Sequence, residues 1–133
     1  MKEMTTALII EEKRLLVVHN IKHRLRIEPP GGKKEDGEIL EDCVVREARE
    51  ELNIDIKILE LFGVYNTNSP EGNFRVSMYL SEIKNGIPEI QEKNKHSKFE
   101  WCNYSSLENY KQQKYLVPNL CEALEKLKSL DYI

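Results

Sequence analysis

Three glutamates on one short stretch are the residues of this chain whose spacing best suits chemistry. The run R-E-A-R-E-E at residues 46–51 puts Glu47, Glu50 and Glu51 three and four positions apart. In a helix these positions share one face, where like charges repel at a cost of roughly 0.2–0.5 kcal/mol per pair. Carboxylate oxygens at this spacing suit a hard divalent cation such as Mg²⁺. Such a run taken alone more often covers a solvated helix face, so the neighbouring residues decide between the two interpretations.

Those neighbours supply what a cation site would need. The Gly31-Gly32 turn comes just before the acidic stretch and could offer a backbone carbonyl to the cation. Arg46 can hold a carboxylate with its planar guanidinium, and Glu38 is placed to pair with it near the start of a helix. A cation held there would neutralise phosphate charge, polarise a P–O bond and activate water. The pattern therefore predicts hydrolysis of a phosphate anhydride, with one glutamate able to take a proton from water.

These residues require a helix that buries one side and exposes the other. Asn53 could end such a helix, because Asn tolerates the left-handed conformation. From about Ile39 to Leu52, apolar residues recur every four positions, at Leu40, Val44, Ala48 and Leu52. We therefore predict a helix over 39–52 whose glutamates lie on an arc beside the apolar stripe.

Alternating and β-rich runs predict a sheet around this helix. The expected strands are Thr5–Ile10, Arg14–His19, Ile54–Tyr65, Phe74–Ile83 and Lys98–Asn103, the first two forming a hairpin. Ile21–Glu28 alternates basic and apolar residues until two prolines stop it. We expect a polar turn over 33–37, a loop over 66–73, a turn or short helix over 105–107, and a terminal helix over Pro118–Leu130. The chain should therefore be one domain of the α/β (α+β) class, residues 1–133.

The bulk composition limits the classes of function. The chain has 133 residues, a formal net charge of -3 and a pI of about 5.7, so it lacks the basic footprint of a protein that grips a nucleic acid polymer. Its three cysteines are widely spaced and form no C-x-x-C pair, which indicates a reducing compartment. The longest apolar stretch near the start, Ala7–Ile10, is too short for a signal or membrane segment. We expect a cytoplasmic protein with no membrane contact.

The wider pattern resembles the Nudix box, G-x5-E-x7-R-E-U-x-E-E-x-G-U, in which U is apolar. The matching positions are Gly32, Glu38, Arg46, Glu47, Ala48, Glu50, Glu51 and Ile54. Asn53 stands where the family has its second glycine, a mild departure because Asn is the next best residue at a helix end. Six fixed residues coincide by chance on the order of 10⁻⁷ per starting point. A solvated helix face therefore does not explain the pattern.

The resemblance continues on both sides of the box. Pro30-Gly31-Gly32 is similar to the family's Pro-Gly-Gly. Downstream, Glu92, Lys95-His96 and Glu100-Trp101 look like the E-P-x-K-x…W segment of MutT-like nucleotide hydrolases. The similarity thus covers roughly residues 5–107.

The resemblance implies a Nudix fold, a mixed β-sheet sandwiched between helices with a loop–helix–loop catalytic motif. It also implies Mg²⁺, or Mn²⁺ in its place, as cofactor. The ligands implied are Glu47, Glu50, Glu51 and the Gly31 carbonyl, with Glu92 as a candidate further ligand. Arg46 would orient the glutamates, and Glu38 would hold Arg46 in place without contacting the ion. The base would be Glu47 or an acid on a loop.

The substrate is set outside the box in this family, and here alternatives stay open. The candidate substrate contacts are Arg24, Arg26, Gly32, Tyr65 and Phe74, for phosphate binding, close backbone approach and base stacking. About half of the side chains on alternating strands should face the core instead. The segment from Glu92 to Trp101 favours a (d)NTP or modified nucleoside triphosphate. Pro70 is similar in position to the downstream proline of ADP-ribose pyrophosphatases, so ADP-ribose or a nucleotide sugar is the alternative.

A non-catalytic nucleotide-binding module is the other reading of the same resemblance. Such a module could lose the glutamates at no cost, and their presence here favours an enzyme. The partner we expect is therefore a small nucleotide substrate. Homodimers are common in the family, and nothing in this sequence indicates one.

Overall fold

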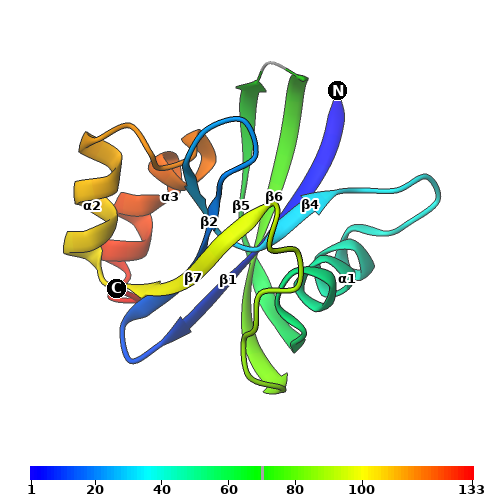
Figure 1. Ribbon diagram of the computed structural model, residues 1–133, viewed down its shortest axis with the longest axis horizontal. Coiled ribbons are helices and arrows are strands. Elements are labelled where there is room, and N and C mark those ends of the chain that lie inside the picture. Colours follow the sequence, from blue (N-terminus) through cyan, green and yellow to red (C-terminus); the bar gives the residue numbers. More distant parts are fainter. Residues whose placement is uncertain (70) are drawn as a thin grey trace.

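Seven strands and three helices make up the part of the chain that the structure describes, residues 1–69 and 71–133 of a computed structural model (Figure 1). The strands are β1 (Lys2–Glu11), β2 (Arg14–Asn20), β3 (Arg26–Glu28), β4 (Gly31–Lys33), β5 (Asp55–Ser69), β6 (Gly72–Asn85) and β7 (His96–Cys102). The helices are α1 (Leu40–Leu52), α2 (Tyr104–Gln112) and α3 (Pro118–Ser129).

Strand β1 organises the sheet. It pairs in parallel with β6, Lys2–Ile9 lying beside Phe74–Ser81. Its end forms the predicted hairpin with β2, and residues 4–6 pair antiparallel with the short β4. The remaining strands extend the two sides, because β5 pairs with β6 while β3 and β7 both pair with β2. The glycine pair of β4 is therefore fixed to the central strand.

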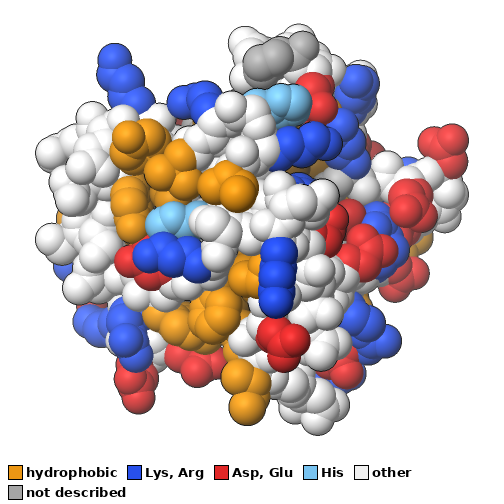
Figure 2. Space-filling model, in the orientation of Figure 1, with side chains coloured by type: hydrophobic (Ala, Val, Ile, Leu, Met, Phe, Trp, Pro, Cys, Tyr) orange, Lys and Arg blue, Asp and Glu red, His pale blue; other side chains and the backbone are white. Residues whose placement is uncertain are grey.

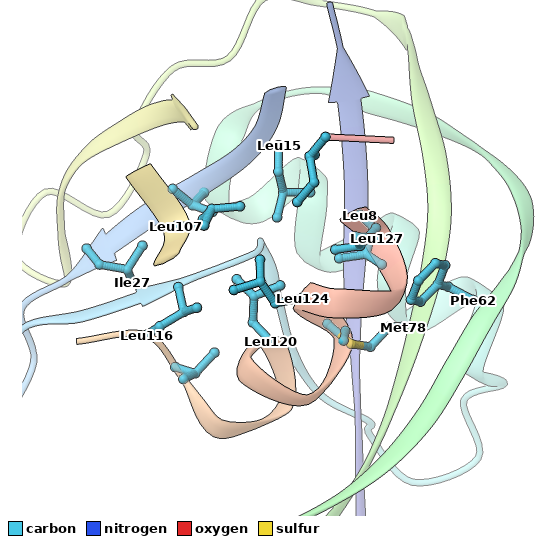
Figure 3. Packing of buried hydrophobic residues seen from close by; sticks show 14 of the residues in the cluster. Leu8, Leu15, Ile27, Phe62, Met78, Leu107, Leu116, Leu120, Leu124 and Leu127 are labelled. Atoms are coloured by element: carbon cyan, nitrogen blue, oxygen red, sulfur yellow. The ribbon is translucent and has the colours of Figure 1, made fainter. Parts of the chain in front are cut away.

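Helices cover both faces of this mixed sheet (Figure 1). Alternation along β1 separates the two cores, because Ala7 and Ile9 pack on the α1 side and Leu8 packs on the α3 side. Figure 3 shows the second core, in which the leucines of α3 meet the strands: Leu120, Leu124 and Leu127 lie near Leu8, Leu15 and Met78. Burying one leucine contributes about 1.5–3 kcal/mol. The predicted sandwich of a mixed sheet between helices is confirmed.

The longest hairpin differs most from the sequence prediction. The loop expected over 66–73 was wrong, since β5 runs to Ser69 and β6 begins at Gly72. Ladder pairs such as Thr67 with Phe74 continue the hairpin through polar residues. Backbone pairing does not need apolar side chains on an exposed ribbon, and this is why the polar composition was misleading.

Three shorter segments also differ from the expectation. Only Arg26–Glu28 of the alternating run 21–28 is a strand, and His23 within it has a left-handed backbone with φ 77°. Gly31–Lys33 forms strand β4, so the polar turn begins after it. Helix α2 is a full nine residues, because Asn103 caps it by accepting the Ser106 N–H. None of the helices that the structure describes is long and apolar enough to span a membrane.

Asn53 ends α1 in the left-handed region, with φ 55° and ψ 39°, as predicted. We expect Asn53→Ala to lower the free energy of unfolding by about 1 kcal/mol, because a Cβ without a local polar partner tolerates this region poorly. Asn53→Gly should leave the stability unchanged or raise it. Urea denaturation measures both variants, and an alanine variant as stable as the parent would contradict the expectation.

Candidate active site

Helix α1 is held to the sheet by small and apolar side chains. Its three glutamates, Glu47, Glu50 and Glu51, lie at the edge of this packed face, and we call this edge, with the adjoining β4 turn, the acidic margin. Thr5 Oγ1 on β1 donates a hydrogen bond of 3.2 Å to the buried Cys43 Sγ of α1. The three predicted ligands then run from the interior to water. The Glu51 side chain is 3% exposed, Glu47 is 13% exposed and Glu50 is 53% exposed. A bound ion at this margin would therefore be partly enclosed and partly open.

Arg46 joins the loop before α1 to this acidic face. Its Nε and Nη2 donate to the two carboxylate oxygens of Glu38, at 2.7 and 3.0 Å, and Nη2 also donates to the Lys33 carbonyl at 3.1 Å. Its Nη1 donates to Glu47 at 2.9 Å and to Glu50 at 3.2 Å. The guanidinium lowers the pKa of Glu38 to about 2, and the carboxylates raise the pKa of Arg46. The predicted pairing of Glu38 with Arg46 is thus present, in the bidentate form that suits arginine.

Glu51 turns in the other direction, toward β4. Its Oε1 accepts the Gly31 N–H at 2.9 Å, and its Oε2 lies 3.7 Å from both Lys95 Nζ and His96 Nε2. Burial raises the pKa of Glu51 well above its usual value, and the Gly31 bond and Lys95 only partly oppose this. His96 is fully buried, and burial lowers its pKa to about 4, so its ring is neutral at pH 7. The neutral imidazole therefore adds no countercharge beside Glu51.

A further acid, Glu28 at the end of β3, belongs to the same region. Its Oε1 accepts a hydrogen bond of 2.6 Å from Asn20 Nδ2, and burial raises its pKa. Burial also raises the pKa of Glu47. The charges of Glu28 and Glu47 both act on Glu51 and raise its pKa further. Three acids in one region thus keep raised pKa values, so the positive charge nearby does not offset their burial.

The glycine pair permits the close approach of three elements. A Cβ on Gly31 would lie 2.0 Å from the Thr5 carbonyl oxygen of β1. A Cβ on Gly32 would lie 2.5 Å from Glu47 Cδ. The first distance is to rigid backbone and excludes a side chain, whereas the second requires the end of the Glu47 side chain to move. The two glycines therefore let β4 lie against β1 on one side and under the Glu47 carboxylate on the other.

The Gly31 carbonyl is directed toward α1 as well. The Pro30 carbonyl accepts the Ala7 N–H of β1, and bonded positions alternate along an antiparallel strand. Gly31 therefore points away from β1, as its bond to Glu51 demonstrates. An extended residue directs its N–H and C=O to the same side, so the Gly31 oxygen faces the region between β4 and α1.

This donor set suits a hard divalent cation, although its members are not yet gathered around one point. Among the described residues, no three acidic, His or Cys side chains converge closely enough to hold an ion. Arg46 keeps Glu47 and Glu50 on one side while Glu51 faces Gly31. Carboxylate and carbonyl oxygens are the ligands that Mg²⁺ prefers, and buried acids without full compensation are stabilised by a cation. The four groups would hold the ion after Glu47 and Glu50 turn from Arg46.

Glu92 lies apart from this group as the structure stands. It is exposed, and its backbone carbonyl accepts the N–H groups of Lys95 and His96 just before β7. No contact joins its carboxylate to the acidic margin within the described residues. Its role as a further ligand stays a prediction.

The candidate substrate residues fall into two groups. Gly32 and Arg26 lie at the acidic margin, Arg26 being close enough to lower the pKa of Glu28. Arg24 is exposed, with Nη1 at 3.5 Å from the Lys114 carbonyl. Tyr65 and Phe74 pack into or against the α3-side core, and Phe74 is only 3% exposed. The structure thus gives these two rings a packing role, and Pro70 lies outside the described residues.

The sequence assigned no role at this site to Glu28 or Lys95, although Lys95 belongs to the segment that resembles MutT-like hydrolases. No local motif marks Glu28, because it is brought in by the pairing of β3 with β2, where it lies opposite Val18. Lys95 arrives through the pairing of β7 with β2, where His96 lies opposite Asn20. For Glu28 the available signal was alternation, since Arg26 and Glu28 must share a face of the same strand.

The two glycines should respond differently to alanine. Gly31→Ala places a Cβ against rigid backbone and should lower the free energy of unfolding by about 1–3 kcal/mol or more. In Gly32→Ala the new Cβ contacts only the end of the Glu47 side chain, which can move, so the free energy of unfolding should fall less than in Gly31→Ala. The displaced Glu47 should then lose its hydrogen bond to Arg46. Chemical denaturation of both variants measures the difference. A larger loss for Gly32→Ala than for Gly31→Ala would refute this account of the turn.

The Arg46–Glu38 pair predicts a low carboxyl pKa. A pKa lowered in the folded state stabilises the fold above the ordinary value of about 4.3, and that stabilisation is lost as the pH falls toward 2. NMR titration of the Glu38 carboxyl carbon should give a pKa near 2 in the parent chain. In Arg46→Met, which keeps the aliphatic stem, it should return toward the ordinary value. An unchanged Glu38 pKa in that variant would show that another group is responsible.

Comparison with known proteins agrees with this geometry. The family model described as NUDIX domain matches residues 2–120. A NUDIX hydrolase from Nitrosomonas europaea has a similar structure, with a TM-score of 0.84, 16% identity, and coverage of 98% of this chain and 90% of that one. A search of curated proteins finds no match.

Two further solved structures share the fold. The MutT protein from Methanosarcina mazei Go1 has a TM-score of 0.80 at 18% identity, covering 99% of this chain and 96% of that one. A C. elegans Ap4A hydrolase binary complex has a TM-score of 0.78 at 19% identity, covering 98% and 97%. At these identities the likeness establishes the fold, and the family model establishes the relationship. The chain therefore belongs to the NUDIX family of hydrolases, which act on nucleoside diphosphate derivatives.

Proposed function

We propose that this Nudix hydrolase uses Mg²⁺, or Mn²⁺ in its place, to cleave a phosphoanhydride bond of a (d)NTP or modified nucleoside triphosphate. The observation that carries the proposal is the buried acidic margin of α1. There Glu47 and Glu51 have raised pKa values beside the glycine turn of β4. A bound cation would offset the burial of carboxylates at this density. The exposed Glu50 completes a set that substrate phosphates can reach from water.

Each residue of the margin has a distinct task in this proposal. A bound Mg²⁺ would supply charge neutralisation of the phosphates and activation of a water molecule. Glu51 is anchored by the Gly31 N–H, and Arg46 sets the positions of Glu47 and Glu50. Glu47 is the candidate base, because burial keeps its pKa raised and so improves its ability to take a proton from water near neutral pH.

The choice of substrate rests on two supports. Residues 92–101 are similar to the downstream segment of MutT-like nucleotide hydrolases, and the Methanosarcina MutT protein shares the fold. An Ap4A hydrolase shares the same fold, so the side chains around the margin must make the choice. Arg26 is the basic residue among the candidates that lies there, beside Glu28.

The metal assignment predicts the effect of Glu51→Gln. The glutamine can still accept the Gly31 N–H and removes a buried charge, so the fold should be retained or made more stable. Loss of a direct ligand should reduce Mg²⁺-dependent hydrolysis by at least about 100-fold. Glu60→Gln, an exposed glutamate of β5, is the matched control and should keep full activity. Normal turnover by Glu51→Gln would remove the metal site from the proposal.

The same assay distinguishes the substrates. A panel of dNTPs, oxidised dNTPs, dinucleoside polyphosphates, ADP-ribose and nucleotide sugars, each with Mg²⁺, is scored by product. Preference for a triphosphate with release of pyrophosphate or phosphate supports the proposal and shows which phosphorus is attacked. Preference for ADP-ribose or a nucleotide sugar would replace it with a pyrophosphatase of that class. Binding without turnover of any compound would indicate a non-catalytic module.

A further inference from the structure

Lys95 lies at the end of a segment that is docked on the last turn of α1. The Glu89 N–H donates to the Leu52 carbonyl at 3.0 Å, and the Gln91 N–H donates to the Glu51 carbonyl at 3.2 Å. Residues 86–95 thus satisfy carbonyl groups that a helix end leaves without partners. This docking fixes the segment next to Glu51, the most buried of the proposed metal ligands.

The backbone of Lys95 is itself held on both sides. Its N–H donates to the Glu92 carbonyl at 3.0 Å, and its carbonyl accepts the Ile21 N–H at 2.8 Å. Its side chain is 32% exposed and reaches inward, with Nζ at 3.7 Å from Glu51 Oε2. A lysine on an unfixed surface segment would lose more conformational entropy on making this contact than Lys95, whose backbone is already held.

The charge of Lys95 acts on three acids. It lowers the pKa values of Glu28, Glu47 and Glu51, against the burial that raises them. Arg46 is already engaged with carboxylates at the other end of the margin. Figure 2 shows the resulting surface, in which acidic side chains gather at the right beside the loop before α1 with basic side chains among them. Lys95 is thus the lysine whose ammonium group lies 3.7 Å from the buried Glu51 carboxylate, at the inner end of this region.

We propose that Lys95 is a tethered counter-ion of the metal site, with which an arriving divalent cation must compete for Glu51. The inference rests on the metal site proposed above and adds a residue outside the Nudix box. In the metal-free protein the ammonium group offsets the buried carboxylate. When a divalent ion is bound, the same ammonium group repels it. The charge of Lys95 therefore weakens metal binding and stabilises the fold when no metal is bound.

Removing this charge should therefore strengthen metal binding. Unit charges about 4 Å apart near a protein surface interact strongly enough to change a binding constant tenfold or more. We expect Lys95→Met to bind Mn²⁺ on the order of tenfold more tightly than the parent chain, as measured by electron paramagnetic resonance or calorimetry on the full chain at fixed ionic strength. The Tm of the metal-free variant should be lower, and Mn²⁺ should raise it by more than it raises the parent's.

Two variants make the test specific. Lys95→Arg keeps the charge and should bind Mn²⁺ like the parent. Lys93→Met removes an exposed lysine of the same segment and should also leave Mn²⁺ affinity unchanged. Equal or weaker Mn²⁺ binding by a folded Lys95→Met, checked by circular dichroism, would overturn the inference and give Lys95 a purely structural role.

Failure of the inference and failure of the proposed function give different results. If the parent binds Mn²⁺ and Glu51→Gln does not, the metal site is correct, and the Lys95→Met affinity alone decides the inference. If the parent binds no Mn²⁺, both the metal site and the counter-ion are overturned.

Discussion

The attachment of Arg46 to several oxygen acceptors at once is the interaction on which the rest of the site depends. One guanidinium bonds the loop before α1, through Glu38 and the Lys33 carbonyl, and also bonds the helix face, through Glu47 and Glu50. The loop and the helix are therefore held in one arrangement by a side chain that cannot lose its charge. The same bonds occupy the carboxylates in the metal-free protein. Assembly of the proposed metal centre would thus be an exchange of partners by Glu47 and Glu50 within this frame.

The inner and outer ends of the acidic margin differ in their exposure to water. Glu50 is half exposed, so its charge is screened by water and its side chain can turn. Glu51 is buried between α1 and β4, and its acceptor atoms are already assigned to Gly31 and to the neighbourhood of Lys95. The close approach that fixes Glu51 is possible only because residue 31 has no side chain.

Local patterns gave the helix and its acidic face correctly, because the four-residue apolar repeat and the charges are written in one continuous stretch. The Arg46–Glu38 pair was predictable for the same reason, as both residues belong to one motif. The polar half of the β5–β6 hairpin was not predictable from composition, because its pairing uses backbone groups that any residue carries. Glu28 and Lys95 were missed because strand pairing with β2 brings them to the site from distant positions in the chain. Tyr65 and Phe74 were predicted to contact substrate, but Phe74 lies in the α3-side core and Tyr65 packs against it, because alternation along a strand does not by itself say which face meets a ligand.

The parallel pairing of β1 with β6 has a consequence for how the protein is made. Lys2–Ile9 precedes its long partner Phe74–Ser81 in the chain, and the whole Nudix box and the outer strand β5 lie between them. Contacts between such distant segments form late, since loop closure must be completed before they contribute. Helix α1 can form early, but the sheet on which it packs stays incomplete until β6 has been synthesised and has paired with β1. A nascent chain that ends after the box residues therefore lacks the strand on which the sheet beneath α1 depends, and its acidic residues remain solvated until Phe74–Ser81 has been synthesised.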